Sequence, residues 1–317
     1  WEKLERGFYM ASQTNVREMI AKNNAKKGGA SDKIVPIILG IISAISILTT
    51  IAILFTLLTE TITFFTRVPF SKFFLTGTWN PTGSNPEYGI WALIIGTLKI
   101  TFIATIVSVP IGLGAAIYLN EYASDRTRRI IKPILEILAG IPTIVFGFFA
   151  LTFVTPILRS IIPGLGEFNS ISPGIVVGIM IVPIITSLSE DAMSSVPNKI
   201  REGAYGLGAT KFEVATKVVL PAATSGVVAS IVLGVSRAIG ETMIVSLAAG
   251  STPTSSLSLT SSIQTMTGYI VEVATGDAPF GSDIYYSIYA VGFTLFIFTI
   301  IMNLLSQWIS KRFREEY

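Results

Sequence analysis

Arg237 and Glu241 are two ionisable residues four positions apart in the segment SRAIGETMIV, which otherwise has the composition of a membrane-spanning helix. Charged groups at such depth are costly, usually face a cavity or a partner, and mark functional pathways. The Arg237 guanidinium is permanently charged, weakly hydrated and suited to tetrahedral oxyanions by its forked donors. One hypothesis is therefore an anion pathway. The other is an ion pair within one helix that serves structure alone, although Arg before Glu is the less favourable order for such a pair.

The composition of the chain is that of an integral membrane protein. Of its 317 residues, 50% are hydrophobic and 14% are charged, and the mean hydropathy is +0.65. The absence of cysteine and histidine excludes disulfides, thiolate metal sites and histidine proton relays. No clustered acidic motif suggests a metal site, and no nucleophile, base and orienting group assemble into a reaction centre. We therefore expect no enzyme, no metal or cofactor bound by this chain, and no nucleic-acid partner.

Six segments are long and apolar enough to form transmembrane helices, because roughly 20 helical residues cross the hydrocarbon core. They are residues 34–58, 90–119, 130–158, 173–188, 219–249 and 284–309. These segments predict an all-α membrane protein with six transmembrane helices. Besides Arg237 and Glu241, the spans contain Lys99 and Glu136. The long stem of Lys99 is expected to snorkel towards a surface, and Glu136 is expected to form an ion pair with Lys132 one turn away.

The distribution of basic residues predicts which loops face the cytoplasm. Eighteen of the 23 lysines and arginines fall before residue 34, in 120–132, in 189–217 or after 310. The opposite loops hold only Arg67, Lys72 and Arg159. This bias favours cytoplasmic N- and C-termini in a multi-pass protein of the cell (inner) membrane.

The spans and the charges together predict three regions. Residues 1–33 form a basic cytoplasmic N-terminal segment, near the lipid head groups of the bilayer. Residues 34–310 form the six-helix transmembrane domain, which includes a cytoplasmic loop at 189–218, and residues 311–317 form a cytoplasmic tail. Because the first residue is Trp1 and not methionine, Met10 is a candidate natural start.

The loop at 189–218, which leads into the fifth span, has a sequence that predicts secondary structure within the loop itself. The stretch EGAYGLGATKFEVATKVVLP, residues 202–221, predicts a short helix, a break at 206–208 and a second helix that enters the span. A generic connection between spans would not need two amphipathic turns around glycines. The chain has no G-x-x-x-x-G-K-[ST] segment and therefore no nucleotide cradle of that kind.

This loop resembles the motif of binding-protein-dependent ABC importer permeases, which reads Glu-Ala-Ala, three residues, Gly, nine residues, then Ile-x-Leu-Pro. The chain matches the motif at Glu202, Gly203, Ala204, Gly208, Val218, Leu220 and Pro221. Gly203 replaces the first alanine and Val218 replaces the isoleucine, and both changes are small. The resemblance implies the type I (MetI-like) permease fold with cytoplasmic coupling helices. It also implies that Glu202, Gly203, Ala204 and Gly208 dock onto a separate ATPase subunit.

Further segments resemble the phosphate branch of this family, and its PstC type in particular. They are GIWALIIGTLKITFIATIVSVPIGLGAAIYLNEYA, LEILAGIPTIVFGFFAL and SRAIGETMIVSLAAG. The resemblance implies a permease subunit of an ATP-driven inorganic phosphate importer. Its implied partners are a similar PstA-like permease, two PstB-like ATPase subunits that use ATP and Mg, and an external PstS-like phosphate-binding protein.

Alternatives to this function remain open at the level of sequence. Within the family they are an importer of another oxyanion, sulfate or molybdate, and the PstA-type paired subunit. Outside it, a secondary transporter or channel predicts transport without any ATPase, and leaves the coupling motif unexplained. A structural scaffold predicts that neutral residues at Arg237 and Glu241 spare uptake.

The resemblance makes Arg237 and Glu241 candidates for the substrate path or its gate. In a continuous fifth helix, sixteen residues at 1.5 Å put Arg237 about 24 Å beyond Pro221, in the outer half of the membrane. We hypothesise that the Glu241 carboxylate offsets Arg237 when no anion is bound and accepts a hydrogen bond from the O–H of protonated phosphate. Sulfate lacks this proton near neutral pH, so the same carboxylate would reject it.

Overall fold

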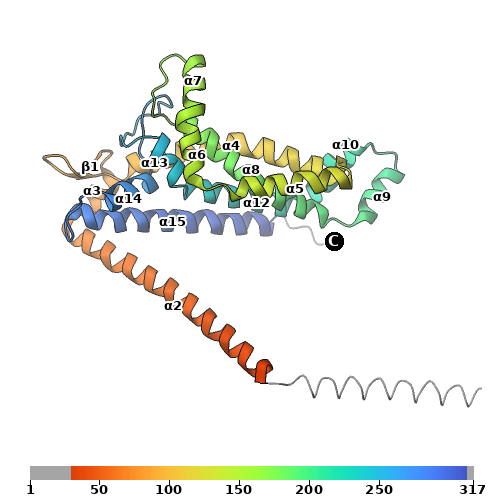
Figure 1. Cartoon of the computed structure of the whole chain (residues 1–317), viewed down its shortest axis with the longest axis horizontal. Coiled ribbons are helices and arrows are strands. Elements are labelled where there is room, and N and C mark those ends of the chain that lie inside the picture. The colour runs from red at the N-terminus through yellow and green to blue at the C-terminus, as the bar shows by residue number, and fades with distance from the viewer. Residues whose placement is uncertain (1–29, 313–317) are drawn as a thin grey trace, which may run out of the picture. The chain divides into compact units, whose positions relative to one another are not determined.

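The computed structural model describes residues 30–312 (Figure 1), so the predicted segments 1–33 and 311–317 lie almost entirely outside the described residues. The chain divides into two units, with the boundary between Thr56 and Leu57 inside helix α2 (Ala30–Arg67). The first unit contributes the N-terminal part of α2, whose side chains from residue 34 to residue 56 carry no charge. Hydroxyls such as that of Ser43 donate to a carbonyl one turn earlier, which satisfies them in an apolar environment.

Four long helices of the second unit run side by side (Figure 1). They are α4 (Trp91–Ile117), α8 (Ile171–Ser194), α12 (Thr224–Ile239) and α15 (Asp283–Arg312). Helix α8 packs against α4 and α12, and α12 packs against α15. Small residues allow this close packing. A Cβ atom on Gly112 of α4 or on Gly234 of α12 would lie 2.9 or 3.0 Å from the Ile185 side chain of α8.

The predicted six-span architecture is confirmed. Within the described residues, five helices are long and apolar enough to cross a membrane, and a bent pair at 211–239 makes a sixth. The bounds of the third span were wrong: residues 125–161 form an amphipathic helix, α5, followed by a separate apolar span. Their elements are α5 (Asp125–Gly140), α6 (Thr143–Phe149), η2 (Ala150–Val154) and α7 (Thr155–Ile161).

The break between α5 and α6 has a local cause. Ile141 is extended, and Pro142 lacks the backbone N–H that would continue the hydrogen-bond ladder of α5. Figure 1 shows α6 and α7 running across the direction of α5. No residue of α5 is buried in this chain, so a hydropathy window that joined the two helices combined a surface helix with a span.

One end of the helical bundle, called the hairpin end here, is built from aromatic side chains. Its elements are α3 (Phe70–Leu75), β1 (Trp79–Asn80), β2 (Glu87–Tyr88) and α14 (Met266–Thr275). The two strands pair antiparallel, with Trp79 opposite Tyr88. Phe64, Trp79, Tyr88 and Tyr269 are buried together, and the Trp79 ring lies 4.8 Å from the Tyr269 ring in an edge-to-face arrangement.

The opposite end of the bundle, called the loop end here, consists of short elements around the coupling motif. They are η1 (Tyr118–Tyr122), α9 (Asn198–Gly206), α10 (Lys211–Glu213), η3 (Val214–Val219) and α11 (Leu220–Ala222). The segments η1, η2 and η3 are π-helical, a geometry that is rare and frequent at functional sites. A buried apolar cluster that includes Met193, Val196 and Val214 packs these elements onto the bundle.

Candidate functional site

The predicted fifth span is not one continuous helix. Helices up to Ala222 and from Thr224 onwards meet at a bend of 75°, and α12 ends at Ile239. A second short helix, α13 (Met243–Ala248), follows after Gly240–Thr242. The expectation of a straight helix from 219 to 249 was therefore wrong, and the rise of about 24 Å calculated along it does not describe the position of Arg237.

Glu241 lies in this second break, and its side chain explains why the chain restarts as a helix there. Its Oε1 atom accepts hydrogen bonds from the backbone N–H groups of Met243 (3.1 Å) and Ile244 (3.3 Å). Such bonds satisfy donors that have no partner within the first turn of α13. The residue is 7% exposed. The hydroxyl of Thr267 in α14 donates to the Glu241 carbonyl at 2.7 Å, so both the side chain and the backbone are held.

Arg237 lies in the last turn of α12 and is exposed. Within the described residues, its guanidinium forms no hydrogen bond and no ion pair, with Glu241 or with any other side chain. The alternative of a structural ion pair within one helix was therefore wrong, because the helix ends between the two residues. The neighbouring Ser236 hydroxyl donates to Asn303 of α15 at 3.1 Å, which ties this turn of α12 to the last span.

Helix α13 is fixed against α6 by a glycine. A Cβ atom on Gly147 would lie 2.8 Å from Leu247 Cδ1 and 3.1 Å from the Met243 carbonyl oxygen. Only glycine allows the two short helices to approach so closely. The break that holds Glu241 is therefore supported on one side by α14 and on the other by α6.

Lys99 is not a snorkelling side chain, contrary to expectation. It is 7% exposed, and its Nζ donates to the carbonyls of Ser256 and Ser258, at 2.9 Å in the second case. These carbonyls belong to the loop 251–265, which joins α13 to α14. Two more contacts hold the loop to α4. The Met266 N–H donates to Thr97 Oγ1 at 3.0 Å, and Gly96 packs directly against the Gln264 backbone carbonyl. Lys99 thus holds this loop to α4 through backbone carbonyls.

The coupling motif has the predicted helix, break and second helix. Glu202 and Gly203 of α9 are exposed, whereas Ala204 is half-buried and packs onto the apolar cluster of the loop end. Gly208 has a φ of 85°, which a residue with a side chain adopts only at a cost. A hollow of about 410 Å³ opens around Gly208, between residues 204 and 218. Leu207 projects from the break with 91% of its surface exposed.

The second helix of the motif begins with a capping box. Thr210 Oγ1 accepts from the Glu213 N–H, and Glu213 Oε2 accepts from the Thr210 N–H at 3.1 Å. Lys217 Nζ lies 3.0 Å from Glu213 Oε1.

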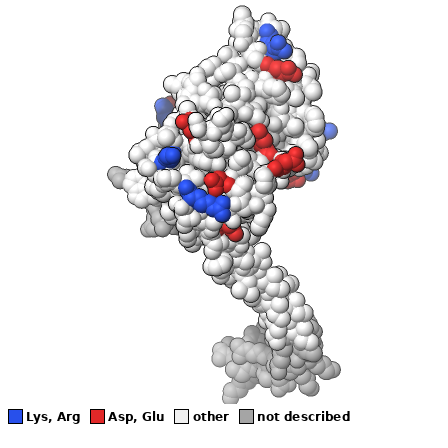
Figure 2. All heavy atoms as spheres, turned by 90° about the vertical axis from the view of Figure 1, so that its left-hand side faces the viewer, with Lys and Arg blue, Asp and Glu red and all other residues white. Residues whose placement is uncertain are grey.

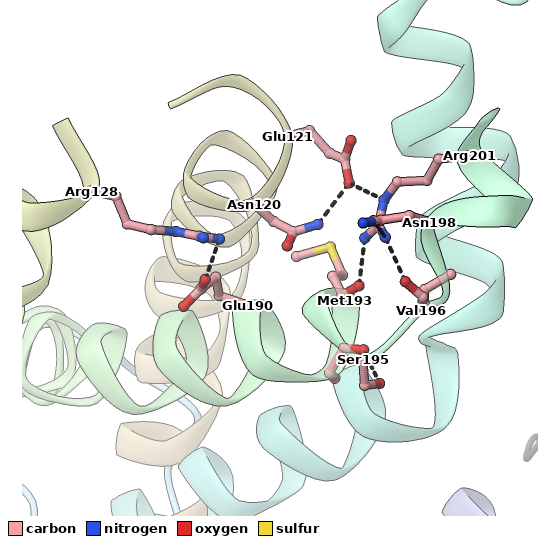
Figure 3. Close-up of polar contacts among 10 residues, drawn as sticks. Asn120, Glu121, Arg128, Glu190, Met193, Ser195, Val196, Asn198 and Arg201 are labelled. Carbon is pink, nitrogen blue, oxygen red and sulfur yellow. Dashed lines mark hydrogen bonds and ion pairs between the residues drawn. The ribbon is translucent and has the colours of Figure 1, made fainter. Parts of the chain in front are cut away.

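Two further charged clusters lie at the loop end (Figure 3), and neither was predicted from the sequence. Arg201, the residue before Glu202, contacts Glu121 of η1 and two backbone carbonyls. Glu190 of α8 is 2% exposed and pairs with Arg128 and Lys132 of α5, at 2.5 and 2.6 Å.

The expected Glu136–Lys132 ion pair was therefore wrong. Lys132 faces Glu190 on α8, and Glu136 is exposed. The Lys132–Glu190 contact lacks hydrogen-bond geometry, so Glu190 Oε2 is held by charge alone. No sequence signal indicated Glu190, which lies two residues beyond the predicted end of the fourth span.

Residues 108–315 match the family described as binding-protein-dependent transport system inner membrane component. The chain is 35% identical over 235 residues to the probable ABC transporter permease protein YqgH of Bacillus subtilis (strain 168), covering 74% of this chain and 75% of that one. It is 33% identical over 261 residues to the phosphate transport system permease protein PstC of Mesorhizobium japonicum, covering 76% and 78%.

A solved structure supports the fold. A chain of a bacterial alginate ABC transporter, crystallised in complex with an alginate pentasaccharide-bound periplasmic protein, superposes with a TM-score of 0.62 at 16% identity, over 90% of this chain and 98% of that one. The multi-pass helical architecture agrees with these matches. The chain belongs to the family of binding-protein-dependent transport system inner membrane components.

Proposed function

We propose that this chain is a transmembrane permease subunit of an ATP-driven inorganic phosphate importer, which forms the translocation path and couples it to a separate ATPase. The observation that carries the proposal is the exposed Arg237 guanidinium, which has no partner among the described residues and precedes by four residues a carboxylate that is fixed in place. Relatives named phosphate transport permeases, with about a third of their aligned residues identical, support phosphate as the anion.

Arg237 offers the anion a permanent positive charge inside the membrane domain. Its forked donors suit the tetrahedral oxygens of phosphate, and a low dielectric strengthens the attraction. Since Arg237 faces outwards from this chain, a path that encloses the anion needs a second wall. A similar, PstA-like permease subunit provides that wall, so the path or gate at Arg237 lies between the two subunits.

Glu241 acts beside the anion and not as a permanent partner of Arg237. Its Oε1 is engaged by the N–H groups at the start of α13, and its Oε2 lies outside those bonds. Oε2 is therefore the atom that accepts the O–H of protonated phosphate. Because Oε1 of the same carboxylate binds the first N–H groups of α13, phosphate bound at Oε2 acts directly on the start of that helix.

The coupling loop provides the contact with the ATPase. Its short helix and glycine break, which contain Glu202, Gly203, Ala204 and Gly208, dock onto the partner as one rigid element. The exposed Leu207 side chain inserts into an apolar groove on that partner. Two PstB-like subunits bind ATP and Mg and hydrolyse ATP, so this chain holds no cofactor itself. A PstS-like phosphate-binding protein delivers the anion at the hairpin end. The loop end and both termini are cytoplasmic, in the inner membrane.

The test is ATP-dependent phosphate uptake by the complete importer in vesicles, with Arg237→Gln and Glu241→Gln compared at matched assembly. We expect each variant to lose at least about tenfold in uptake, since each removes a charged contact to the anion, while ATP hydrolysis continues. Arg159→Gln is the matched control, because Arg159 is also exposed and lies away from the break. Normal uptake by both site variants would exclude the proposed path.

Competition decides between the oxyanions. Unlabelled phosphate should suppress uptake of labelled phosphate, whereas sulfate and molybdate should not. If sulfate or molybdate competes better, the chain is the permease of that oxyanion instead.

A further inference from the structure

Arg201 connects three elements of the loop end through one side chain (Figure 3). Its Nε lies 3.3 Å from Glu121 Oε1 in η1. Its Nη2 donates to the Met193 carbonyl of α8 at 2.7 Å, and its Nη1 donates to the Val196 carbonyl. Nη1 also donates to Asn198 Oδ1, at the start of α9, at 3.1 Å. The Arg201 side chain is 14% exposed and that of Glu121 is 5% exposed.

These bonds supply hydrogen-bond donors to the backbone carbonyls at the C-terminal end of α8. The last carbonyls of a helix have no intrahelical donor, and they carry the negative end of its dipole. A planar guanidinium can satisfy two carbonyls and a carboxylate at the same time, which an ammonium group cannot do in this fixed geometry. Glu121 in turn has no other cationic partner among the described residues; Asn120 Nδ2 lies 2.6 Å from the same Oε1 atom.

Besides Arg201, α9 is attached to α8 by a short linker and by the apolar contacts of Ala204 with the cluster around Met193. Helix α8 ends at Ser194 and α9 begins at Asn198. The intervening residues 195–197 lie outside regular helix, so a change in their backbone torsions would let α9 slide against the apolar cluster. The Arg201 bonds instead fix α9 to the end of α8 and to η1, which continues α4.

The end of α8 is fixed a second time, one turn earlier. Glu190 is held by Arg128 and Lys132 on α5, and α5 leads through Pro142 into the helix that packs against α13. Removal of one partner from such a buried cluster leaves an uncompensated charge. The loop end therefore joins α9 to α4 and α8, and α8 to α5, through charged side chains.

We infer that Arg201 is the positioning residue that makes the coupling helix α9 and the ends of α8 and α4 move as one body. This inference rests on the proposed function, in which a partner ATPase moves α9. The contacts of Arg201 with Glu121, Met193 and Val196 are called the clamp here. Because of the clamp, a displacement of α9 moves α8 and α4 as well, and does not only change the backbone torsions of residues 195–197.

The decisive measurement is the amount of phosphate transported per ATP hydrolysed by the complete importer in vesicles. We expect Arg201→Gln to lower this ratio roughly tenfold, because several hydrogen bonds to a charged group are lost, while hydrolysis stays stimulated by the binding protein. Arg126→Gln is the matched control: Arg126 lies at the same end, is exposed, and has no hydrogen bond or ion pair with a described residue. An unchanged ratio in Arg201→Gln, or an equal loss of uptake and hydrolysis, overturns the inference.

Two more variants keep the test informative if Arg201→Gln does not assemble. Arg201→Lys keeps the charge near Glu121 but not the fork, so only partial recovery is expected. Glu121→Gln keeps the carbonyl bonds and removes the ion pair, and it should lower the ratio by a smaller factor. In the double variant with Arg201→Gln the losses should not add, because both residues act in one contact. An unchanged ratio in Glu121→Gln and full recovery in Arg201→Lys would contradict the clamp.

A readout that does not depend on the transported anion separates this inference from the proposed function. Amide hydrogen exchange at residues 195–206 of the assembled complex should rise about tenfold in Arg201→Gln and stay unchanged in Arg126→Gln. Failure of wild-type phosphate uptake would refute the proposed substrate, and the exchange result would still decide the role of Arg201. Equal exchange in wild type and Arg201→Gln would refute the clamp, whatever the anion.

Discussion

At the scale of single residues, Arg237 and Glu241 are close in sequence but have different environments. Arg237 lies in the last turn of α12 with an exposed guanidinium, whereas Glu241 is buried and accepts hydrogen bonds from the first N–H groups of α13. The types of these residues, and their depth in an apolar segment, could be read from the sequence. Their separation by a helix break could not, because it depends on Thr267 and on the close approach of α6 at Gly147.

Gly96 of α4 shows how a single position holds the loop 251–265 in place. A Cβ atom there would lie 2.1 Å from the Gln264 carbonyl oxygen. Gly96→Ala should therefore displace the loop and lower the free energy of unfolding by about 1–3 kcal/mol, the usual cost of overpacking. Thermal unfolding of the purified protein in detergent measures this.

Gly114 on the same helix supplies the control. It has no atom within 4 Å of an added Cβ, so Gly114→Ala should be neutral or stabilise the helix by up to about 1 kcal/mol. Equal midpoints for the two variants would show that the Gly96 contact does not constrain the loop.

At the scale of elements, the coupling loop was the part best predicted from sequence. The short helix, the glycine break and the second helix were all expected, because the spacing of glycines and apolar residues acts locally. The third and fifth spans were less well predicted. Pro142 and Gly240 lie where those helices break, but a window of average hydropathy does not register a change of direction.

Gly208 gives a prediction about the coupling loop. Its φ of 85° lies in the left-handed region, so Gly208→Ala should strain the break by about 1–2 kcal/mol. We expect weaker binding of the ATPase subunits and less uptake, measured by co-purification and by ATP-dependent transport in vesicles.

Gly206, two residues earlier, is the comparison. It ends α9 with a helical backbone and has open space around it, so Gly206→Ala should keep ATPase binding. If both alanine variants bound the ATPase as tightly as wild type, the left-handed turn would not matter for docking.

At the scale of the whole molecule, the proposed function assigns to this chain the path of the anion and the contact with the ATPase, and assigns ATP hydrolysis to a partner. The chain lacks a nucleotide cradle in its sequence, and its Arg237 faces outwards. Both features fit the proposed assembly with a second permease and with ATPase subunits.

This reasoning predicts that vesicles containing the chain alone take up no phosphate, with or without ATP. Addition of the paired permease, the ATPase subunits and the binding protein should restore uptake. Labelled phosphate inside the vesicles, counted over time, measures both states. Substantial uptake by the chain alone would favour a secondary transporter or channel over the importer subunit.

The sequence by itself determined the membrane class, the number of spans, the coupling motif and the two charged residues of the candidate path. These properties follow from composition, helix length and short-range spacing. The tertiary structure alone decided the partners of Lys99, the pairing of Glu190 with α5 and the clamp formed by Arg201. Each of these contacts joins residues far apart in the chain or uses backbone carbonyls as acceptors, so helix packing, and not local pattern, brings the charges together.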